Sequence, residues 1–237
     1  MNERIWELDV FRGICILGMV VVHAVYDLVT LYAMVDWQLP QTFLFVQKWG
    51  GVLFLLLSGI CVTLGSRSVR RGIIVFLCGF LCTLVTWGMY AFGMADKSLI
   101  IYFGVLHCLG SCMMLWPLFR RLPWWLLAVL GVAMAAVGLY FAELPGVSTY
   151  LLMPFGRPWA GFASSDYFPL LPNLGFFLVG AVLGRLVYGK KQTLFPKVKG
   201  DHFIIRFFQG CGKHSLWIYL LHQPILSGLF YVIALLK

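Results

Sequence analysis

Seven long apolar runs dominate this sequence and decide what it can fold into. A helix needs about 20 mainly apolar residues to cross a bilayer, and runs of that length follow one another here. They lie at residues 10–32, 43–65, 72–92, 99–118, 123–142, 168–188 and 214–236. Only 11% of the residues are charged, whereas a soluble domain has about 25%. We therefore expect an all-α integral membrane protein, a helical bundle of about seven spans that forms a single domain over residues 1–237.

Lysine and arginine gather beside alternate loops, before the first span, after the second and fourth, and before the seventh. By the positive-inside rule, this places the N-terminus in the cytoplasm and the C-terminus outside. The same rule accounts for the net charge of +9, so no nucleic-acid partner is expected. The seven cysteines lie within or beside the spans without a C-x-x-C pair, which favours packing roles and predicts no metal site.

The first span carries ionisable residues on one face. At about 100° per residue, one stripe holds Asp9, Arg12, Ile16, Met19, His23, Asp27 and Thr30. Ionisable residues in a span face the bundle interior or a watery cavity. A rise of about 1.5 Å per residue puts His23 about 16 Å above Arg12, near the midplane of a slab about 30 Å thick. Asp27, one turn further on, is placed to hydrogen-bond His23 and fix its tautomer.

Two more histidines come out at the same depth. His107 lies thirteen residues before Arg120 and His222 lies nine residues after Lys213, so both fall near the midplane. Ser215, Tyr219 and His222 share one helix face. We expect His23, His107 and His222 to line a common polar cavity.

The longest predicted outer loop, residues 152–173, is rich in proline, glycine and aromatic residues. Stacked aromatic rings suit sugar rings, but such residues also anchor any membrane protein at the interface. The aromatic residues of this loop can therefore serve either to stack on a sugar or to anchor the loop at the interface. The polar candidates for binding an acceptor substrate in this loop are Arg157, Asp166, Tyr167 and Asn173.

Four motifs, taken together, resemble a known family. "LDVFRG", "FGVLH", "DYFPLLP" and "HSLWIYLLHQP" occur in this order and are similar to motifs of the bacterial relatives of heparan-α-glucosaminide N-acetyltransferase. The spacing of Arg12 and His23 also resembles the opening helix of the membrane acyltransferases of acyltransferase family three. The resemblance implies an enzyme of the bacterial plasma membrane that moves an acyl group, usually acetyl, from cytosolic acyl-CoA to a sugar hydroxyl or amine. It does not extend to glucosaminide specificity, because the loop over residues 33–42 has no histidine.

The resemblance also implies roles for individual residues. His23 is the catalytic histidine, as base or acyl carrier, and Asp27 is its orienting partner. Beyond the resemblance, we expect His107 and His222 to stabilise the developing oxyanion or to line the tunnel. Arg12 holds the CoA end. Further candidate contacts to the CoA phosphates are Arg67, Arg70, Arg71, Arg120 and Arg121.

Two other functions are compatible with the residues alone. Midplane histidines and an aspartate equally suit a proton-coupled transporter, although no inverted repeat or pair of broken helices is visible. A non-catalytic membrane partner would leave the polar stripe unexplained. The expected partners are therefore acyl-CoA, a glycan or cell-envelope acceptor and the bilayer, and a homo-oligomer is left open.

Overall fold

The computed structural model describes residues 5–198, 200 and 202–236. Its helices form two compact units, and each is described by itself. The terminal unit contains Met1–Phe54 and Lys190–Lys237, and the central unit contains Leu55–Gly189. Helix α2 (Gln41–Leu64) runs through the boundary between them.

The predicted all-α fold is confirmed. Among the described residues, six helical segments are long and apolar enough to cross a membrane: Trp6–Leu31, Gln41–Leu64, Ser68–Ala91, Trp124–Ala142, Leu170–Val187 and Ser215–Leu235. Their bounds lie within a few residues of six predicted spans, because uninterrupted apolar length is a strong local signal.

The fourth predicted span, residues 99–118, is wrong in its first part. Helix α4 begins only at Val105 and ends at Phe119, so its 15 residues rise about 22 Å, less than the thickness of the hydrocarbon core. Before it, Lys97–Leu99 form a short 3-10 helix, η2, and Phe103 pairs with Tyr167 in an isolated bridge. The apolar residues just before Gly104 are thus held by a distant loop instead of joining the helix.

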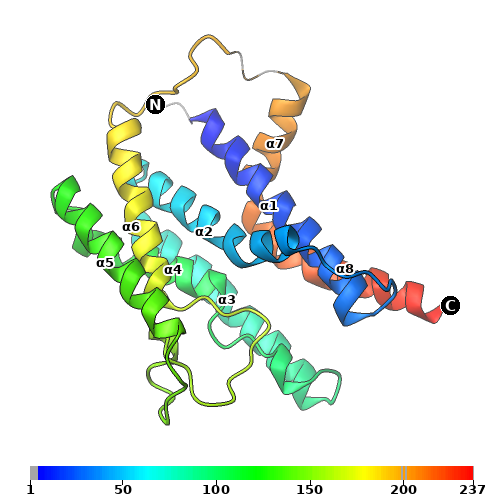
Figure 1. Cartoon of the computed structure of the whole chain (residues 1–237). Coiled ribbons are helices and arrows are strands. Elements are labelled where there is room, and N and C mark those ends of the chain that lie inside the picture. Colours follow the sequence, from blue (N-terminus) through cyan, green and yellow to red (C-terminus); the bar gives the residue numbers. More distant parts are fainter. Residues whose placement is uncertain (1–4, 199, 201, 237) are drawn as a thin grey trace. The chain divides into compact units, whose positions relative to one another are not determined.

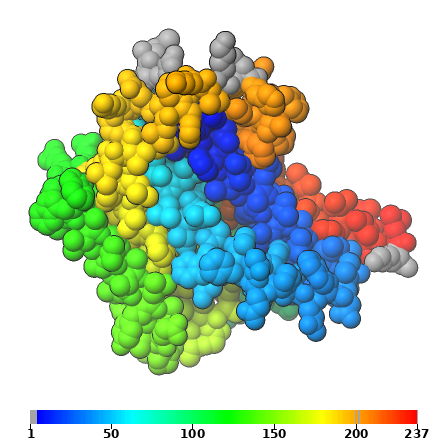
Figure 2. Space-filling view, turned by 45° about the horizontal axis from the view of Figure 1, so that its top comes forward, coloured from blue at the N-terminus to red at the C-terminus, as the bar shows by residue number. Residues whose placement is uncertain are grey.

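In the central unit, α3 (Ser68–Ala91) packs along α4, α5 (Trp124–Ala142) packs along α6 (Leu170–Val187), and α4 also contacts α6. The α5 and α6 ribbons run side by side in Figure 1, and their green and yellow surfaces adjoin in Figure 2. Glycines make the close approaches: a Cβ at Gly110 would meet the backbone of Gly72, and one at Gly175 would meet Ala135. Small residues let membrane helices approach closely in this way.

In the terminal unit, α1 (Trp6–Tyr26) continues into a π-helical turn, η1 (Asp27–Leu31), and contacts both α7 (Phe203–Lys213) and α8 (Ser215–Leu235). Helix α7 was not predicted, since it is short and contains two glycines. It lies directly on α1, orange beside blue in Figures 1 and 2. A Cβ at Gly212 would overlap the carbonyl of Asp9, so this glycine permits the helix contact.

Candidate active site

The ionisable stripe of α1 faces protein, as predicted. Three of its residues are buried: Asp9, Ile16 and Asp27. On the other faces Phe11 and Val21 are more than half exposed. Thr30 departs from the stripe and is exposed, because the wider π-helical turn from Asp27 onward changes the angular spacing of the side chains.

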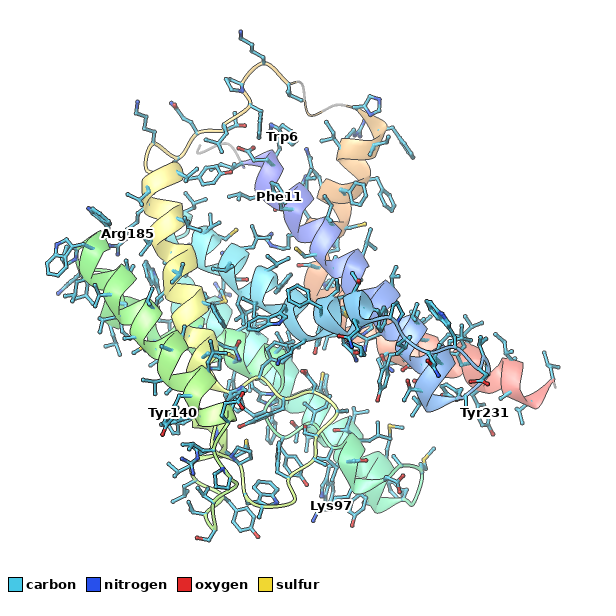
Figure 3. The ribbon with its side chains drawn as sticks, in the orientation of Figure 1. Trp6, Phe11, Lys97, Tyr140, Arg185 and Tyr231 are labelled. Atoms are coloured by element: carbon cyan, nitrogen blue, oxygen red, sulfur yellow. The ribbon has the colours of Figure 1, made fainter. Side chains whose placement is uncertain are left out.

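Arg12 forms an ion pair with Asp9 near the start of α1. Arg12 Nη1 and Asp9 Oδ1 are 3.0 Å apart, and Asp9 is the more deeply buried of the two side chains. Trp6 and Phe11, labelled in Figure 3, lie on the same stretch of α1. The pair keeps the carboxylate of the stripe neutralised while Arg12 retains its place at the end of α1 that is predicted to be cytoplasmic.

His23 and His222 lie together, as predicted for two of the three histidines. Their rings meet edge to face with centroids 5.0 Å apart, although the two residues lie on α1 and α8. The ring of His23 makes no hydrogen bond to any residue in the described part of the chain. Its nitrogens are therefore available to a ligand.

The tautomer of His222 follows from a hydrogen bond of its Nδ1. Nδ1 lies 2.6 Å from the carbonyl oxygen of Tyr219. A carbonyl only accepts, so Nδ1 carries the proton and, in the neutral ring, Nε2 is left as an acceptor. His222 is only 9% exposed, and its Nε2 has no partner among the residues that the structure describes. A buried acceptor without a partner costs free energy, which suits a group that meets a proton donor when substrate binds.

Asp27 does not orient His23, so that expectation is wrong. The helix widens at Asp27, and the carboxylate lies against α8, where Oδ2 accepts a hydrogen bond of 2.8 Å from Gln223 Nε2. Gln223 Oε1 is buried and unpartnered within the described residues. Gln223 therefore ties Asp27 to α8 and offers a second acceptor beside His222.

His107 lies in the central unit, where both of its ring nitrogens contact neighbouring residues. Nδ1 accepts a hydrogen bond of 3.2 Å from the backbone N–H of Gly104, at the start of α4. Nε2 lies 3.4 Å from Oγ1 of Thr83, which donates in turn to the carbonyl of Ile101. The side chain is 3% exposed and stacks on Phe103. This geometry makes His107 a cap of α4, and its place in a cavity shared with His23 and His222 stays a prediction.

The four loop residues that are candidates for binding the acceptor substrate make contacts within the protein. Asp166 Oδ2 accepts from the N–H of Val105 at 3.0 Å, and Tyr167 donates from its hydroxyl to the carbonyl of Met153 at 2.6 Å. Burial raises the pKa of Tyr167, which keeps this hydroxyl a donor. Asn173 and Arg157 donate to the carbonyls of Pro169 and Pro145, respectively. The Asp166 bond ties the loop to the start of α4, and the other three bonds are local contacts of the loop and of the first turn of α6.

The five arginines proposed for CoA are exposed at one end of the central unit. They stand at the start of α3 and the end of α4, which antiparallel packing brings together: Arg67, Arg70, Arg71, Arg120 and Arg121. Arg185, which was not predicted, lies at the same end. It donates to the carbonyls of Leu122 and Arg120 and stacks over Trp116. Figure 3 shows Arg185 and Lys97 at opposite ends of this unit.

One further buried carboxylate escaped the sequence analysis. Glu7 is 2% exposed and accepts two hydrogen bonds of 2.8 Å, from Thr193 Oγ1 and the N–H of Leu194. Its position just before "LDVFRG" gives no local signal of these partners, which lie more than 180 residues away.

The comparison with protein families agrees with the membrane-spanning helices. A family model described as heparan-alpha-glucosaminide N-acetyltransferase, catalytic, matches residues 4–224. No curated protein and no solved structure matches the chain significantly. The match spans most of the sequence, and the described residues include six long apolar helices. The chain is therefore an integral membrane protein that belongs to the heparan-alpha-glucosaminide N-acetyltransferase catalytic family.

Proposed function

We propose that this protein transfers an acetyl group, or another acyl group, from cytosolic acyl-CoA to a hydroxyl or amine of a glycan or cell-envelope acceptor. Both units together form the single acyltransferase domain. The N-terminus is cytoplasmic, the acceptor approaches from the opposite side, and the membrane is a bacterial plasma membrane. Membership of an acetyltransferase family supports acetyl-CoA as the donor.

The observation that carries the proposal is the contact between the rings of His23 and His222. Within the described residues, it joins an imidazole that makes no hydrogen bond to one whose Nε2 is a buried acceptor without a partner. General base catalysis needs such a nitrogen within reach of the proton that it removes. A purely structural pair would be expected to satisfy its buried nitrogens.

The transfer balances with this pair as the base. The acceptor oxygen or nitrogen attacks the thioester carbonyl carbon, and its proton passes to the free imidazole nitrogen. The C–S bond then breaks, CoA leaves as a thiolate, and that thiolate takes the proton from the imidazolium to give free CoA. If His23 carries the acyl group, its nitrogen first attacks the thioester and CoA leaves as the C–S bond breaks. The acceptor then attacks the acyl-imidazole, the N–acyl bond breaks, and the acceptor's proton passes to the released imidazole nitrogen.

Arg12 is the proposed contact to CoA on α1, where Asp9 holds its guanidinium. The exposed arginines of the central unit are further candidates for the CoA phosphates, because guanidinium groups bind phosphate with two parallel hydrogen bonds. Their exposure fits a soluble, multiply charged donor.

The test uses purified protein in detergent, with acetyl-CoA binding and release of free thiol as the two measurements. We expect His23→Ala to bind acetyl-CoA but to lose thiol release by about 10²-fold or more. Arg12→Ala should weaken binding by about tenfold or more, the contribution of a hydrogen bond to a charged group. His202→Ala is the matched control, because His202 is exposed and lies outside the pair.

Two results would contradict the proposal. Well-folded wild-type protein that binds no acyl-CoA would leave the arginines without their ligand. Proton-coupled flux through vesicles that depends on His23, without thiol release, would instead favour a transporter.

A further inference from the structure

A small hollow opens in the central unit at the end opposite Arg185. Its cavity volume is about 160 Å³, and it is lined by Lys97, Ser98, Tyr102, Trp159, Gly161 and Ala163. Lys97 marks this end in Figure 3. The lining comes from two segments, one before α4 and one in the long loop before α6. Neither segment contains the residues of the histidine pair.

The aromatic wall of the hollow is held in place by neighbouring rings. Trp159 meets Tyr102, Tyr150 and Phe162 edge to face, with centroids 5.5, 4.9 and 4.7 Å apart, respectively. Such edge contacts are a favoured geometry for aromatic pairs and restrict the ring. The indole of Trp159 is therefore positioned before any ligand arrives.

Backbone contacts fasten the two lining segments to each other. Ser164 Oγ donates to the carbonyl of Ile100 and Ser165 Oγ donates to that of Leu99, both at 2.8 Å. The hydroxyls thus join residues more than 60 positions apart. The hollow is consequently a built feature of the loop, and a ligand need not order its walls.

The polar side of the hollow has an unengaged cation. The side chain of Lys97 is exposed, and its ammonium group makes no ion pair or hydrogen bond with the described residues. Gly161 has a φ of +75°, and a Cβ there would meet nothing within 4 Å, so the space beside the ring stays open. A flat apolar wall and a free ammonium group face the same small volume.

We propose that this hollow binds one sugar ring that carries a carboxylate or phosphate group. The apolar C–H face of a pyranose packs on the ring of Trp159 or Tyr102, and Lys97 pairs with the anionic substituent. The volume favours one ring, because pockets for drug-sized ligands start at roughly 300 Å³. The assignment of this hollow as the docking site of the acceptor rests on the proposed function. Sugar binding itself can be measured without catalysis.

The experiment measures binding of four sugars to the full chain in detergent by saturation-transfer NMR. The probes are glucuronate, glucose 6-phosphate, glucose and glucosamine. We expect both anionic sugars to bind about fivefold more tightly than glucose, the range of an exposed ion pair, and protonated glucosamine to bind most weakly. The two anionic probes separate carboxylate from phosphate recognition.

Two variants keep the test decisive. Lys97→Gln is an exposed change that should fold normally, and it should abolish the preference for anionic sugars. Trp159→Phe should weaken the binding of every sugar, because the phenyl ring offers a smaller stacking surface than the indole. Lys190→Gln, an exposed change in the other unit, is the control. It should change neither the affinity for sugars nor the preference for anionic sugars.

Several outcomes would overturn the inference. No saturable binding of any sugar by wild-type protein, or an anionic preference that persists in Lys97→Gln, would do so. If thiol release from acetyl-CoA is normal in that same preparation, the transferase proposal survives. Sugar binding with the expected preference but without thiol release would support this inference and contradict the transferase.

Discussion

Gln223 donates a hydrogen bond of 2.8 Å to Asp27, which lies 196 positions earlier in the chain. The contact links α8 to the π-helical turn that ends α1, within the terminal unit. It stands next to the His23–His222 contact, since Gln223 follows His222 directly. The tie therefore helps to hold the two histidine-bearing helices in register.

The first prediction concerns Asp27. Asp27→Ala leaves the buried donor of Gln223 without a partner, which costs about 1–3 kcal/mol, and should lower the melting temperature in detergent. Asp27→Asn keeps an oxygen that can accept from Gln223 and should melt close to wild type. Loss of transfer in Asp27→Asn with unchanged melting would instead return Asp27 to a direct role in catalysis.

The second prediction separates the two nitrogens of His222. Asn at this position retains an N–H where Nδ1 donates to Tyr219, but it removes Nε2. We expect His222→Asn to melt near wild type and to lose thiol release by about 10²-fold or more. His222→Gln cannot reproduce the local bond with the same geometry and should lose both stability and turnover.

The control for this pair of variants is His202→Asn, an exposed change that should affect neither measurement. Full turnover in His222→Asn would mean that Nε2 takes no part in the reaction, and His23 alone would then be the base.

The sequence predicted the spans and a shared depth of His23 and His222 for identifiable reasons. Apolar length fixes a span locally, and the depth of His23 and His222 follows from helical rise. The partner of Asp27 could not be predicted in this way, because spacing within one helix says nothing of a glutamine on another. The same holds for Glu7, whose partners Thr193 and Leu194 follow α6 in the chain.

The start of α4 shows a different limit. Residues 99–104 are as apolar as the helix that follows, so hydropathy predicts one continuous span. Leu99 ends η2, and the structure holds residues 100–104 outside any helix through the Phe103–Tyr167 bridge. Helix α4 then begins where Asp166 accepts from Val105. A pairing across more than 60 residues thus overrides the local preference for helix.

The third prediction follows from that contact. Asp166 acts as an N-terminal cap supplied by a distant loop, and removal of such a cap costs about 1 kcal/mol. Asp166→Ala should lower the melting temperature, and Asp166→Asn should restore most of it, since an amide oxygen also accepts. Asp96→Ala, an exposed change at the same end of the unit, is the comparison.

A direct role of Asp166 in acceptor binding makes the opposite prediction. Asp166→Ala would then melt like wild type and lose acceptor turnover, and Asp166→Asn would not restore that turnover.

The last prediction tests the contact between α1 and α7. A Cβ at Gly212 would overlap the carbonyl of Asp9, whereas a Cβ at Gly210, two residues earlier on α7, would meet nothing within 4 Å. Alanine favours a helix over glycine by up to about 1 kcal/mol, so Gly210→Ala should be neutral or stabilising. Gly212→Ala should destabilise, because it must push α7 away from backbone that cannot yield.

The consequence of this difference reaches the site. Asp9 is the partner of Arg12, so displacement of α7 at Gly212 should also weaken acetyl-CoA binding, while Gly210→Ala should bind normally. Melting curves and binding isotherms of both variants measure the two effects. Equal behaviour of the two alanine variants would mean that α7 does not rest on α1, and the unpredicted helix would then have no part in positioning Arg12.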